Sequence, residues 1–218
     1  LLSARGINIS TDEIAAKDKQ FHPEWSDKLP MDVERTYKML TQGKTYGVFQ
    51  LGNKGITDKV KRLKPDSIES ISAISALYRP GPLDAGVVDD YISRKNGETP
   101  ITYPLPILQP ILELTFGCMV YQEQIMKIAQ VMAGYSLGEA DLLRRAMGKK
   151  KPAEMAKQRD RFVSGSISAG VEPDIANKIF DDMSKYAEYC FNASHSIAYS
   201  YISWTTAYLK SNYAADFT

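Results

Sequence analysis

The sequence predicts an all-α protein, mostly helical and with at most one or two very short strands. Three observations support this prediction. Residues that cap helices recur ahead of segments in which apolar side chains repeat at the helical spacing. Several prolines stand where a first helical residue is expected, and glycines stand where helices should end. Only residues 45–51 and 117–121 are β-like, and neither segment has a clear hairpin partner.

The composition is ordinary for a globular protein. The chain has 218 residues, of which 44% are hydrophobic and 24% charged, which excludes a disordered, collagen-like or low-complexity protein. No apolar run approaches the roughly 18 residues that a membrane helix needs, so we expect no integral membrane protein. The sequence begins without Met, a basic start or a sustained apolar core, so we expect no secretory signal and interpret the chain as a fragment.

The N-terminal part predicts a connector followed by a helix. Residues 17–30 are polar, lack periodicity and contain two prolines, as is typical of a connector or a surface insertion. Asp32 can then cap a helix that carries Tyr37 and Leu40 on its apolar face and stops at Gly43.

The next helices are bounded by a capping pattern and by a rigid corner. Asp66 and Glu69 have the spacing of a capping box ahead of an apolar face. This helix must end near Tyr78, because the Pro-Gly-Pro that follows Arg79 cannot continue it. Residues 87–97 predict a further helix that ends at Gly97. Four prolines between residues 100 and 110 predict an irregular segment after it.

The C-terminal half predicts a series of amphipathic helices. One has a second capping box, made by Ser136 and Glu139. In the last helix, the spacing of three aromatic residues favours a place in the core over a platform on which bases stack. The predicted starts are Gln122, the residue after Ser136, Pro152, Pro173 and a position near Ser194.

Total charge predicts no partner, because 27 basic residues oppose 26 acidic ones. The densest charge lies in residues 144–161, where eight basic side chains meet two acidic ones, a local charge of +6. Gly148 is expected to end one helix and Pro152 to begin the next. The turn between them would carry Lys149, Lys150 and Lys151, one helical turn after Arg144 and Arg145.

Such a cluster can hold several phosphate oxygens, because arginine offers a planar fork and lysine a mobile point charge. The alternative is a solvated basic surface. A second basic run consists of Lys59, Lys61, Arg62 and Lys64, on one predicted helix. It is interpreted either as a salt-dependent contact to a nucleic-acid backbone or as an exposed helix face.

Two further segments are open to two interpretations each. Arg79 at the rigid corner either points toward a site or caps the last carbonyls of the preceding helix. Asn192, Ser194 and His195 open the last helix, where free N–H groups, a hydroxyl and an imidazole suit an anion or a base. An ordinary N-cap by Ser194 is the alternative.

Several chemistries find no support in the sequence. It has no GxxxxGK[ST] loop, no GxGxxG after a strand and no zinc-ligand spacing, and we expect neither a catalytic residue nor a metal site. The pairs Asp89-Asp90 and Asp181-Asp182 are predicted to be solvated helix faces. Cys118 and Cys190 should remain unpaired, which favours a reducing, cytoplasmic setting.

Several motifs resemble the fingers region of the bacterial replicative DNA polymerase III alpha subunit family. They occur in the order of that family and cover most of the chain. The matching strings are GVFQL (47–51), RLKPD (62–66), ALYRPGPL (76–83), VVDDYISRKNG (87–97), VYQEQIMKIAQVMAGYSLGEADLLRRAMGKKKPAEMAKQR (120–159) and FNASHSIAYS (191–200).

The resemblance implies a helical fingers domain over residues 31–218, preceded by a palm-to-fingers connector at 1–30. It implies a part in nucleotidyl transfer from a dNTP to a primer 3′-OH during DNA replication. The Mg²⁺ ions would be held by palm aspartates that this chain lacks, so the isolated chain should not polymerise. Residues assigned to nucleotide binding are Arg79, Arg144, Arg145, Lys149, Lys150, Lys151, Asn192, Ser194 and His195; the run Lys59, Lys61, Arg62 and Lys64 is assigned to DNA.

The resemblance also implies partners: template-primer DNA, dNTP, and the sliding clamp, clamp loader and proofreading subunit through regions outside this chain. The alternative function is a stand-alone helical nucleic-acid-binding module without catalysis. Two departures from the family pattern are Ala193, where lysine is usual in FNKSHS, and Gly52-Asn53 in place of Glu-Ser.

The pair Tyr189-Cys190 resembles the junction at which cyanobacterial versions of this polymerase carry a split intein. After splicing, Cys190 would be the residue that follows the intein. Cys190 is equally interpreted as a small hydrophobe ahead of a helix.

Overall fold

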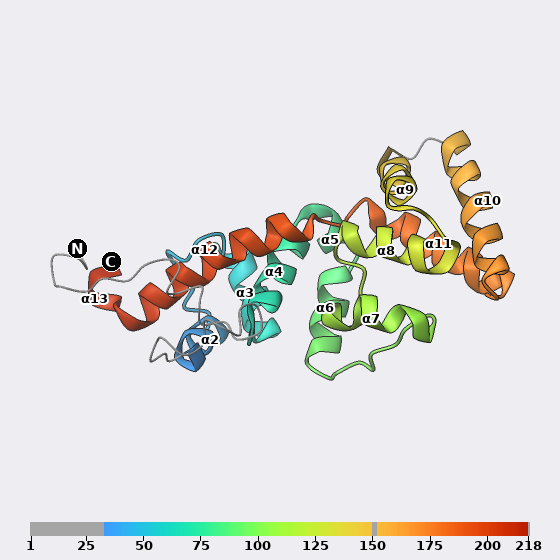
Figure 1. Ribbon diagram of the computed structural model, residues 1–218. Coiled ribbons are helices and arrows are strands. Elements are labelled where there is room, and N and C mark those ends of the chain that lie inside the picture. The colour runs from blue at the N-terminus through green and yellow to red at the C-terminus, as the bar shows by residue number, and fades with distance from the viewer. Residues whose placement is uncertain (1–32, 150–151, 218) are drawn as a thin grey trace, which may run out of the picture. The chain divides into compact units, whose positions relative to one another are not determined.

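The computed structural model describes residues 33–149 and 152–217 (Figure 1). Every regular element in these ranges is a helix, so the all-α expectation is confirmed. The α-helices are α2 (Val33–Thr41), α3 (Lys54–Leu63), α4 (Ile68–Leu77), α5 (Pro80–Asp84), α6 (Val87–Lys95), α7 (Gln109–Leu112), α8 (Gln122–Ala133), α9 (Leu137–Lys149), α10 (Pro152–Ser168), α11 (Pro173–Ala187), α12 (Ala193–Asn212) and α13 (Ala214–Phe217). Two 3₁₀ helices are η3 (Pro106–Leu108) and η4 (Glu113–Thr115).

The described residues form two compact units. The first unit comprises residues 33–75 together with 194–217, and the second comprises residues 76–193. The predicted connector at 1–30 lies outside the described residues. None of the described helices combines the length and the apolar character that crossing a bilayer requires.

The core of the first unit is built from α2, α3, α4 and α12. Trp204 of α12 is buried, and its ring stacks on Tyr208 with 5.6 Å between centroids. Both residues therefore belong to the core, as predicted. Two buried hydroxyl contacts fasten α12: Thr36 Oγ1 lies 2.9 Å from Ser211 Oγ, and Ser196 Oγ donates to the Ser72 carbonyl at 2.8 Å.

The helix starts of the first unit correct one sequence expectation. Helix α4 begins at Ile68, and the backbone N–H of Ser70 donates to Ser67 Oγ at 3.3 Å. Asp66 instead accepts a bond from the Ser70 hydroxyl at 2.8 Å, so the cap lies one residue later than predicted. A serine hydroxyl caps as well as a carboxylate, and here the chain enters the helix at Ser67.

The β-like segment 45–51 forms no strand. It is a succession of turns in which Val48 donates its N–H to the Thr45 carbonyl and Leu51 to the Val48 carbonyl. The unusual Asn53 that follows has a clear structural role. Its side chain accepts the Ile56 N–H at 3.1 Å and caps α3, and asparagine is among the residues that N-caps prefer.

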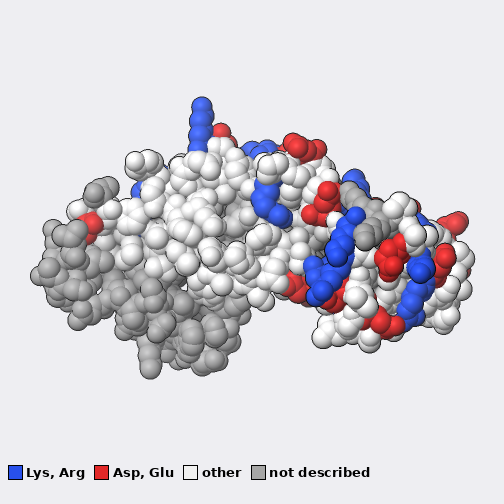
Figure 2. All heavy atoms as spheres, turned by 90° about the horizontal axis from the view of Figure 1, so that it is seen from above, with Lys and Arg blue, Asp and Glu red and all other residues white. Residues whose placement is uncertain are grey.

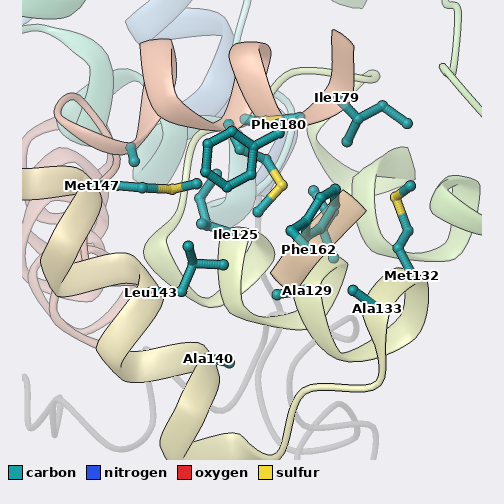
Figure 3. Close-up of a cluster of buried hydrophobic side chains, with 14 of the residues drawn as sticks. Ile125, Ala129, Met132, Ala133, Ala140, Leu143, Met147, Phe162, Ile179 and Phe180 are labelled. Atoms are coloured by element: carbon teal, nitrogen blue, oxygen red, sulfur yellow. The ribbon is translucent and has the colours of Figure 1, made fainter. Parts of the chain in front are cut away.

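Helices α8 to α11 of the second unit enclose an apolar core, drawn in Figure 3. Helix α8 packs against α9 and α10, and α10 packs against α11. Phe162 of α10 and Phe180 of α11 lie side by side in the middle of the cluster, with their ring centroids 5.6 Å apart and both fully buried (Figure 3). Met147 reaches toward Phe180 from α9, so three helices meet at these side chains.

Helices α8 and α10 lie in close contact at Gly165. A Cβ atom at this position would lie 2.5 Å from the Ala133 backbone oxygen, closer than real side chains come. The absence of a side chain therefore sets the distance between the two helices.

The segment 117–121 ahead of α8 is extended and makes one isolated bridge between Tyr121 and Phe191. Gln124 holds the segment in place. Its Oε1 accepts the N–H groups of Val120 and Tyr121, both at 2.9 Å, and its Nε2 donates to Thr115 Oγ1 at 2.8 Å. This buried amide is satisfied on both sides, as a polar group in the interior must be.

Candidate functional site

The candidate site is built on α9, whose first turn forms the capping box that the sequence predicts. The Ser136 N–H donates to Glu139 Oε2 at 2.8 Å, and the Glu139 N–H donates to Ser136 Oγ at 3.3 Å. The hydrogen bond from the Ser136 backbone is the largest cause of a lowered pKa of Glu139. The cap fixes where α9 begins and hence which side chains share a face further along it.

Two arginines of α9 share one carboxylate. Asp141 Oδ1 accepts bonds from Arg144 Nε at 3.0 Å and Nη2 at 2.7 Å, while Asp141 Oδ2 lies 2.8 Å from Arg145 Nε. The bonds from Arg144 are the main cause of a lowered pKa of Asp141. The side chain of Arg145 is 62% exposed against 24% for Arg144, so Arg145 is the arginine that reaches solvent.

The two arginines border a surface hollow of about 290 Å³. The end of α9 corrects the expectation for the lysines, because Gly148 lies inside the helix and Lys149 is its last residue. Lys150 and Lys151 lie outside the described residues. The lining residues of this hollow, which we call the α9 hollow, are Gln122, Arg144, Arg145, Gly148, Lys149, Ala187 and Glu188.

Gln122 links the α9 hollow to the segment that leads into α12. Its Oε1 accepts from Arg144 Nη1 and its Nε2 donates to the Cys190 carbonyl, both at 3.4 Å. Its backbone N–H donates to the Phe191 carbonyl at 2.9 Å. The VYQEQ motif and the FNASHS motif, some 70 residues apart, are thus joined in the second unit.

Glu123 completes this junction. Its Oε1 accepts from Asn192 Nδ2 at 2.7 Å, and its Oε2 accepts the backbone N–H of Ala193 at 3.0 Å. The carboxylate therefore caps the first residue of α12, where negative charge is favourable. The sequence analysis predicted Asn192 as a ligand but missed Gln122, Glu123 and Asp141. The charge count began three residues after Asp141, although a spacing of three or four is the signal for a helical ion pair.

Arg79 contacts protein acceptors of the second unit. Its Nε donates to the Ala76 carbonyl at 2.8 Å, which is the helix-capping role that the sequence left open. Its Nη2 donates to the Tyr189 carbonyl at 2.6 Å, and the guanidinium lies 4.6 Å from the ring centroid of Phe191. Burial lowers the pKa of Arg79. Arg79 therefore holds the chain just ahead of Asn192.

Ser194 and His195 belong to the first unit. The imidazole of His195 stacks on Tyr199, with 4.3 Å between centroids, and Tyr199 lies 6.0 Å from the ring of Phe49. His195 and Tyr199 are both exposed. The sequence analysis missed this aromatic face of α12, although the four-residue spacing from His195 to Tyr199 places both rings on one side of a helix.

The basic run of the first unit lies on α3, as expected, with Lys64 as its C-cap. Lys61, Arg62 and Lys64 are exposed and Lys59 is half-buried. The side-chain stem of Lys61 passes over the turn at Gly43, where a Cβ would lie 2.5 Å from Lys61 Cδ. Contact of this run with DNA stays a prediction.

The two cysteines are free and buried, as expected. Burial raises the pKa of the Cys118 thiol to about 11 and that of Cys190 to about 12. Cys190 is a member of the apolar cluster of the second unit, which supports its interpretation as a small hydrophobe. No group of three or more metal-ligating side chains occurs within residues 33–149 and 152–217.

The remaining arginines of the predicted cluster are paired with acidic residues. Arg159 contacts Asp181 of α11, and Arg161 Nη2 lies 2.8 Å from Glu139 Oε1. Figure 2 shows basic and acidic side chains close together over the helices of the second unit. Three carboxylates therefore offset part of the local charge of +6 that is counted along the sequence.

Comparison with known proteins identifies similar chains. Residues 5–170 match the model of the bacterial DNA polymerase III alpha subunit finger domain. The chain is 50% identical over 190 residues to DNA polymerase III subunit alpha of Aquifex aeolicus, covering 87% of this chain and 16% of the relative. The matching protein of Escherichia coli K12 is 50% identical over 194 residues, or 87% of this chain and 17% of the relative.

A third relative covers nearly the whole chain. DNA polymerase III subunit alpha of Chlamydia trachomatis is 48% identical over 216 residues, which are 99% of this chain and 17% of the relative. The chain thus spans about one sixth of the length of the relatives it matches.

Proposed function

The chain belongs to the family of the bacterial DNA polymerase III alpha subunit finger domain, and from this premise we propose that it is part of a DNA-directed DNA polymerase in which α9 binds the triphosphate of the incoming dNTP. Template-directed nucleotidyl transfer during DNA replication would then be the reaction of the whole polypeptide. The observation that carries the proposal is the α9 hollow, where three basic side chains meet beside the junction that leads into α12.

The charges of the hollow suit a polyphosphate. Arg144, Arg145 and Lys149 line it together with one acidic residue, Glu188. Because Asp141 accepts three bonds from the two guanidinium groups, both groups are oriented before any ligand arrives. Groups that are already oriented bind a triphosphate without a further loss of side-chain entropy, and they neutralise its charge as the transfer proceeds.

The neighbouring residues would position the nucleotide. Gln122 connects Arg144 to the chain at Cys190, and Glu123 holds Asn192 and the start of α12. In the first unit, the exposed stack of His195 on Tyr199 is by itself an aromatic face of the kind on which a nucleobase stacks. The nucleotide ligands proposed in the second unit are Arg144, Arg145, Lys149, Lys150, Lys151 and Asn192. The assignment of Arg79, Ser194 and His195 to nucleotide binding stays a prediction.

The Mg²⁺ that the family resemblance implies does not fit the residues of this chain that the structure describes. They contain no cluster of carboxylates, histidines or cysteines that could hold it. We therefore derive no chemical step through a metal for this chain and assign the ion to other parts of the full-length subunit.

The partners follow from the same proposal. They are template-primer DNA, for which the run on α3 is the proposed contact, and the sliding clamp, clamp loader and proofreading subunit through other regions. The setting would be the cytoplasm. A stand-alone nucleic-acid-binding module is the alternative, and it would bind DNA without any dependence on dNTP.

The test is a primer-extension assay on the full-length subunit with Arg145→Ala or Arg144→Ala. A hydrogen bond between charged groups is worth about 1.5–3 kcal/mol. Each variant should therefore raise the dNTP concentration at half-maximal rate at least about tenfold, since 1.4 kcal/mol is a factor of ten. Primer-template affinity should change much less, because that surface is spread over more residues.

Arg159→Ala is the matched control. Arg159 belongs to the same basic stretch of sequence but contacts Asp181, so its loss should leave the dNTP requirement unchanged. Ala193→Lys restores the residue usual in the family and should tighten dNTP binding. If the α9 variants weaken duplex binding and leave the dNTP requirement intact, α9 contacts the DNA backbone and the proposal is wrong.

A further inference from the structure

The first unit contains a second basic hollow, built from residues far apart in the sequence. Its volume is about 310 Å³. Helix α2 contributes one face, the loop after it contributes a lysine, and the end of α12 closes the other side. The lining residues of this hollow, which we call the basic pocket, are Arg35, Lys38, Met39, Gln42, Lys44, Lys210, Ser211 and Ala214.

The walls of the basic pocket are held by buried or anchored contacts. Arg35, Lys38 and Met39 share one side of α2, and Gln42, just after the last residue of the helix, donates its backbone N–H to the Lys38 carbonyl. The contact between Thr36 Oγ1 and Ser211 Oγ fastens this helix to α12. Lys210 Nζ donates to the Tyr46 carbonyl, which fixes that ammonium at the rim. The positions of the basic groups are therefore set by the fold.

The charge of the basic pocket is of one sign. Its lining contains four basic side chains and, among the described residues, no carboxylate. The two on α2 are three residues apart, where like charges repel. The described part of the first unit carries nine basic and five acidic residues, whereas residues 76–193 carry fourteen and fifteen. An anion that enters the hollow would meet the exposed ammonium groups of Lys38 and Lys44.

The polar groups of the basic pocket indicate which anion. Besides the four cations, the lining offers a side-chain amide at Gln42 and a hydroxyl at Ser211, both able to donate. A phosphodiester has only acceptor oxygens and so matches a wall of donors. An acidic peptide would bring backbone N–H groups that need acceptors. The described lining has no carboxylate that could accept from them. Such a peptide would also lack an apolar anchor, because only Met39 and Ala214 are apolar.

We infer that the basic pocket binds the phosphodiester backbone of DNA, at a position separate from the α9 hollow. The inference rests on the proposed function only for the identity of the polyanion. Burial lowers the pKa of Lys210, and an anion nearby would act in the opposite direction on that pKa. Lys38 and Lys44 are the exposed lysines of the lining and should make direct phosphate contacts.

The experiment measures the salt dependence of DNA binding by the full-length subunit. Primer-template affinity is determined by fluorescence anisotropy between 50 and 200 mM salt, for the wild type and for Lys38→Ala/Lys44→Ala. Each phosphate contact contributes about 0.9 to the slope of log affinity against log salt. The double variant should therefore lower the magnitude of the slope by about 2.

The control pair is Lys127→Ala/Lys185→Ala, two exposed lysines of the second unit. It removes the same charge and should leave the slope within about 0.5 of the wild type. An unchanged slope in the double variant would refute the inference. An unchanged slope together with a lower thermal unfolding midpoint would also refute it, because the basic pocket would then hold an acidic segment of the polypeptide itself.

The test of the basic pocket and the test of the proposed function use different variants and different measurements. The dNTP requirement of Arg145→Ala tests the α9 hollow, and the salt slope of Lys38→Ala/Lys44→Ala tests the basic pocket. A failure of one leaves the other result intact, so the two claims can be separated.

Discussion

The two basic regions of the molecule differ in what surrounds their cations. In the second unit, six arginines donate to acceptors of the protein itself: Asp141, Asp181, Glu139 and the carbonyls of Ala76, Tyr189 and Phe116. In the basic pocket of the first unit, four cations line one hollow whose described lining contains no carboxylate. The densest cluster in the sequence is thus partly neutralised by carboxylates that lie close to it in space.

This comparison shows that the number of basic residues in a stretch of sequence is a poor measure of the electrostatic potential at the surface of the folded protein. A helix brings residues three or four positions away into contact, so a carboxylate just outside a basic stretch can cancel two of its charges. Cations that are scattered in the sequence can also converge in space, as those of the basic pocket do. An anion site can therefore be built from cations that only the fold brings together, as well as from a dense run of cations in the sequence.

The largest effect is expected at Arg79, which donates to two backbone carbonyls and lies over the ring of Phe191. Arg79→Ala removes charged hydrogen bonds worth about 1.5–3 kcal/mol and frees the chain next to Cys190. Alkylation of the native Cys190 thiol, followed by mass spectrometry on the full-length subunit, should accelerate about tenfold or more.

Cys118 serves as the internal control for this measurement. Its buried thiol belongs to another part of the second unit and should keep its slow rate. If both thiols accelerate equally, the variant opens the unit as a whole. Arg79 would then not be a local clamp on the chain ahead of α12.

A smaller effect is expected when the neutralising carboxylate itself is removed. Asp141→Asn frees the guanidinium groups of Arg144 and Arg145 to contact phosphates. The dNTP concentration at half-maximal rate, measured by primer extension with the full-length subunit, should then depend more steeply on salt, because one more positive charge faces the triphosphate. Asp160→Asn, on the exposed side of α10, is the charge-matched control. No steepening would mean that pairing does not explain the contrast between the two regions.

The smallest effect concerns the cap of α9. Ser136→Ala should cost about 1 kcal/mol, seen as roughly fivefold faster hydrogen exchange in the first turn of α9. The pKa of Glu139 is lowered in the folded state, from an ordinary value of 4.5. The stabilisation that the ionised Glu139 carboxylate gives to the folded state is therefore present above pH 4.5. It is lost as pH falls through the lower pKa that Glu139 has in the folded state.

The difference in hydrogen-exchange rate between wild type and Ser136→Ala, measured in the first turn of α9, should accordingly become smaller at acidic pH. Comparing exchange at neutral pH with exchange well below pH 4.5 tests this, with the first turn of α8 as reference. A gap of constant size would show that the Glu139 carboxylate takes no part in the cap.

Much of the fold could be predicted from local patterns. The capping box of Ser136 and Glu139 and the prolines that open α10 and α11 lie where the sequence places them, because caps and first-turn prolines act within a few residues. The errors were equally local. Asp66 was chosen as a cap over Ser67, and Gly148 was taken as a helix end although α9 continues to Lys149.

The candidate site was predicted only in part. The sequence pointed to Arg144, Arg145 and Lys149 by charge, and these residues do line one hollow. It missed Gln122 and Glu123, because their role depends on a junction with residues about 70 positions later. A polar residue near a helix start carries no sign of such a partner.

The sequence by itself determined the helical class, most helix boundaries and the family, since periodicity, caps and motifs are local properties of a chain. Only the tertiary structure decided which cations are neutralised, that Arg79 holds the chain ahead of α12, and that Arg35, Lys38, Lys44 and Lys210 line one pocket. The physical reason is that electrostatic interactions depend on distance in space, and folding brings together charges that the sequence keeps up to 175 residues apart, as it does Arg35 and Lys210.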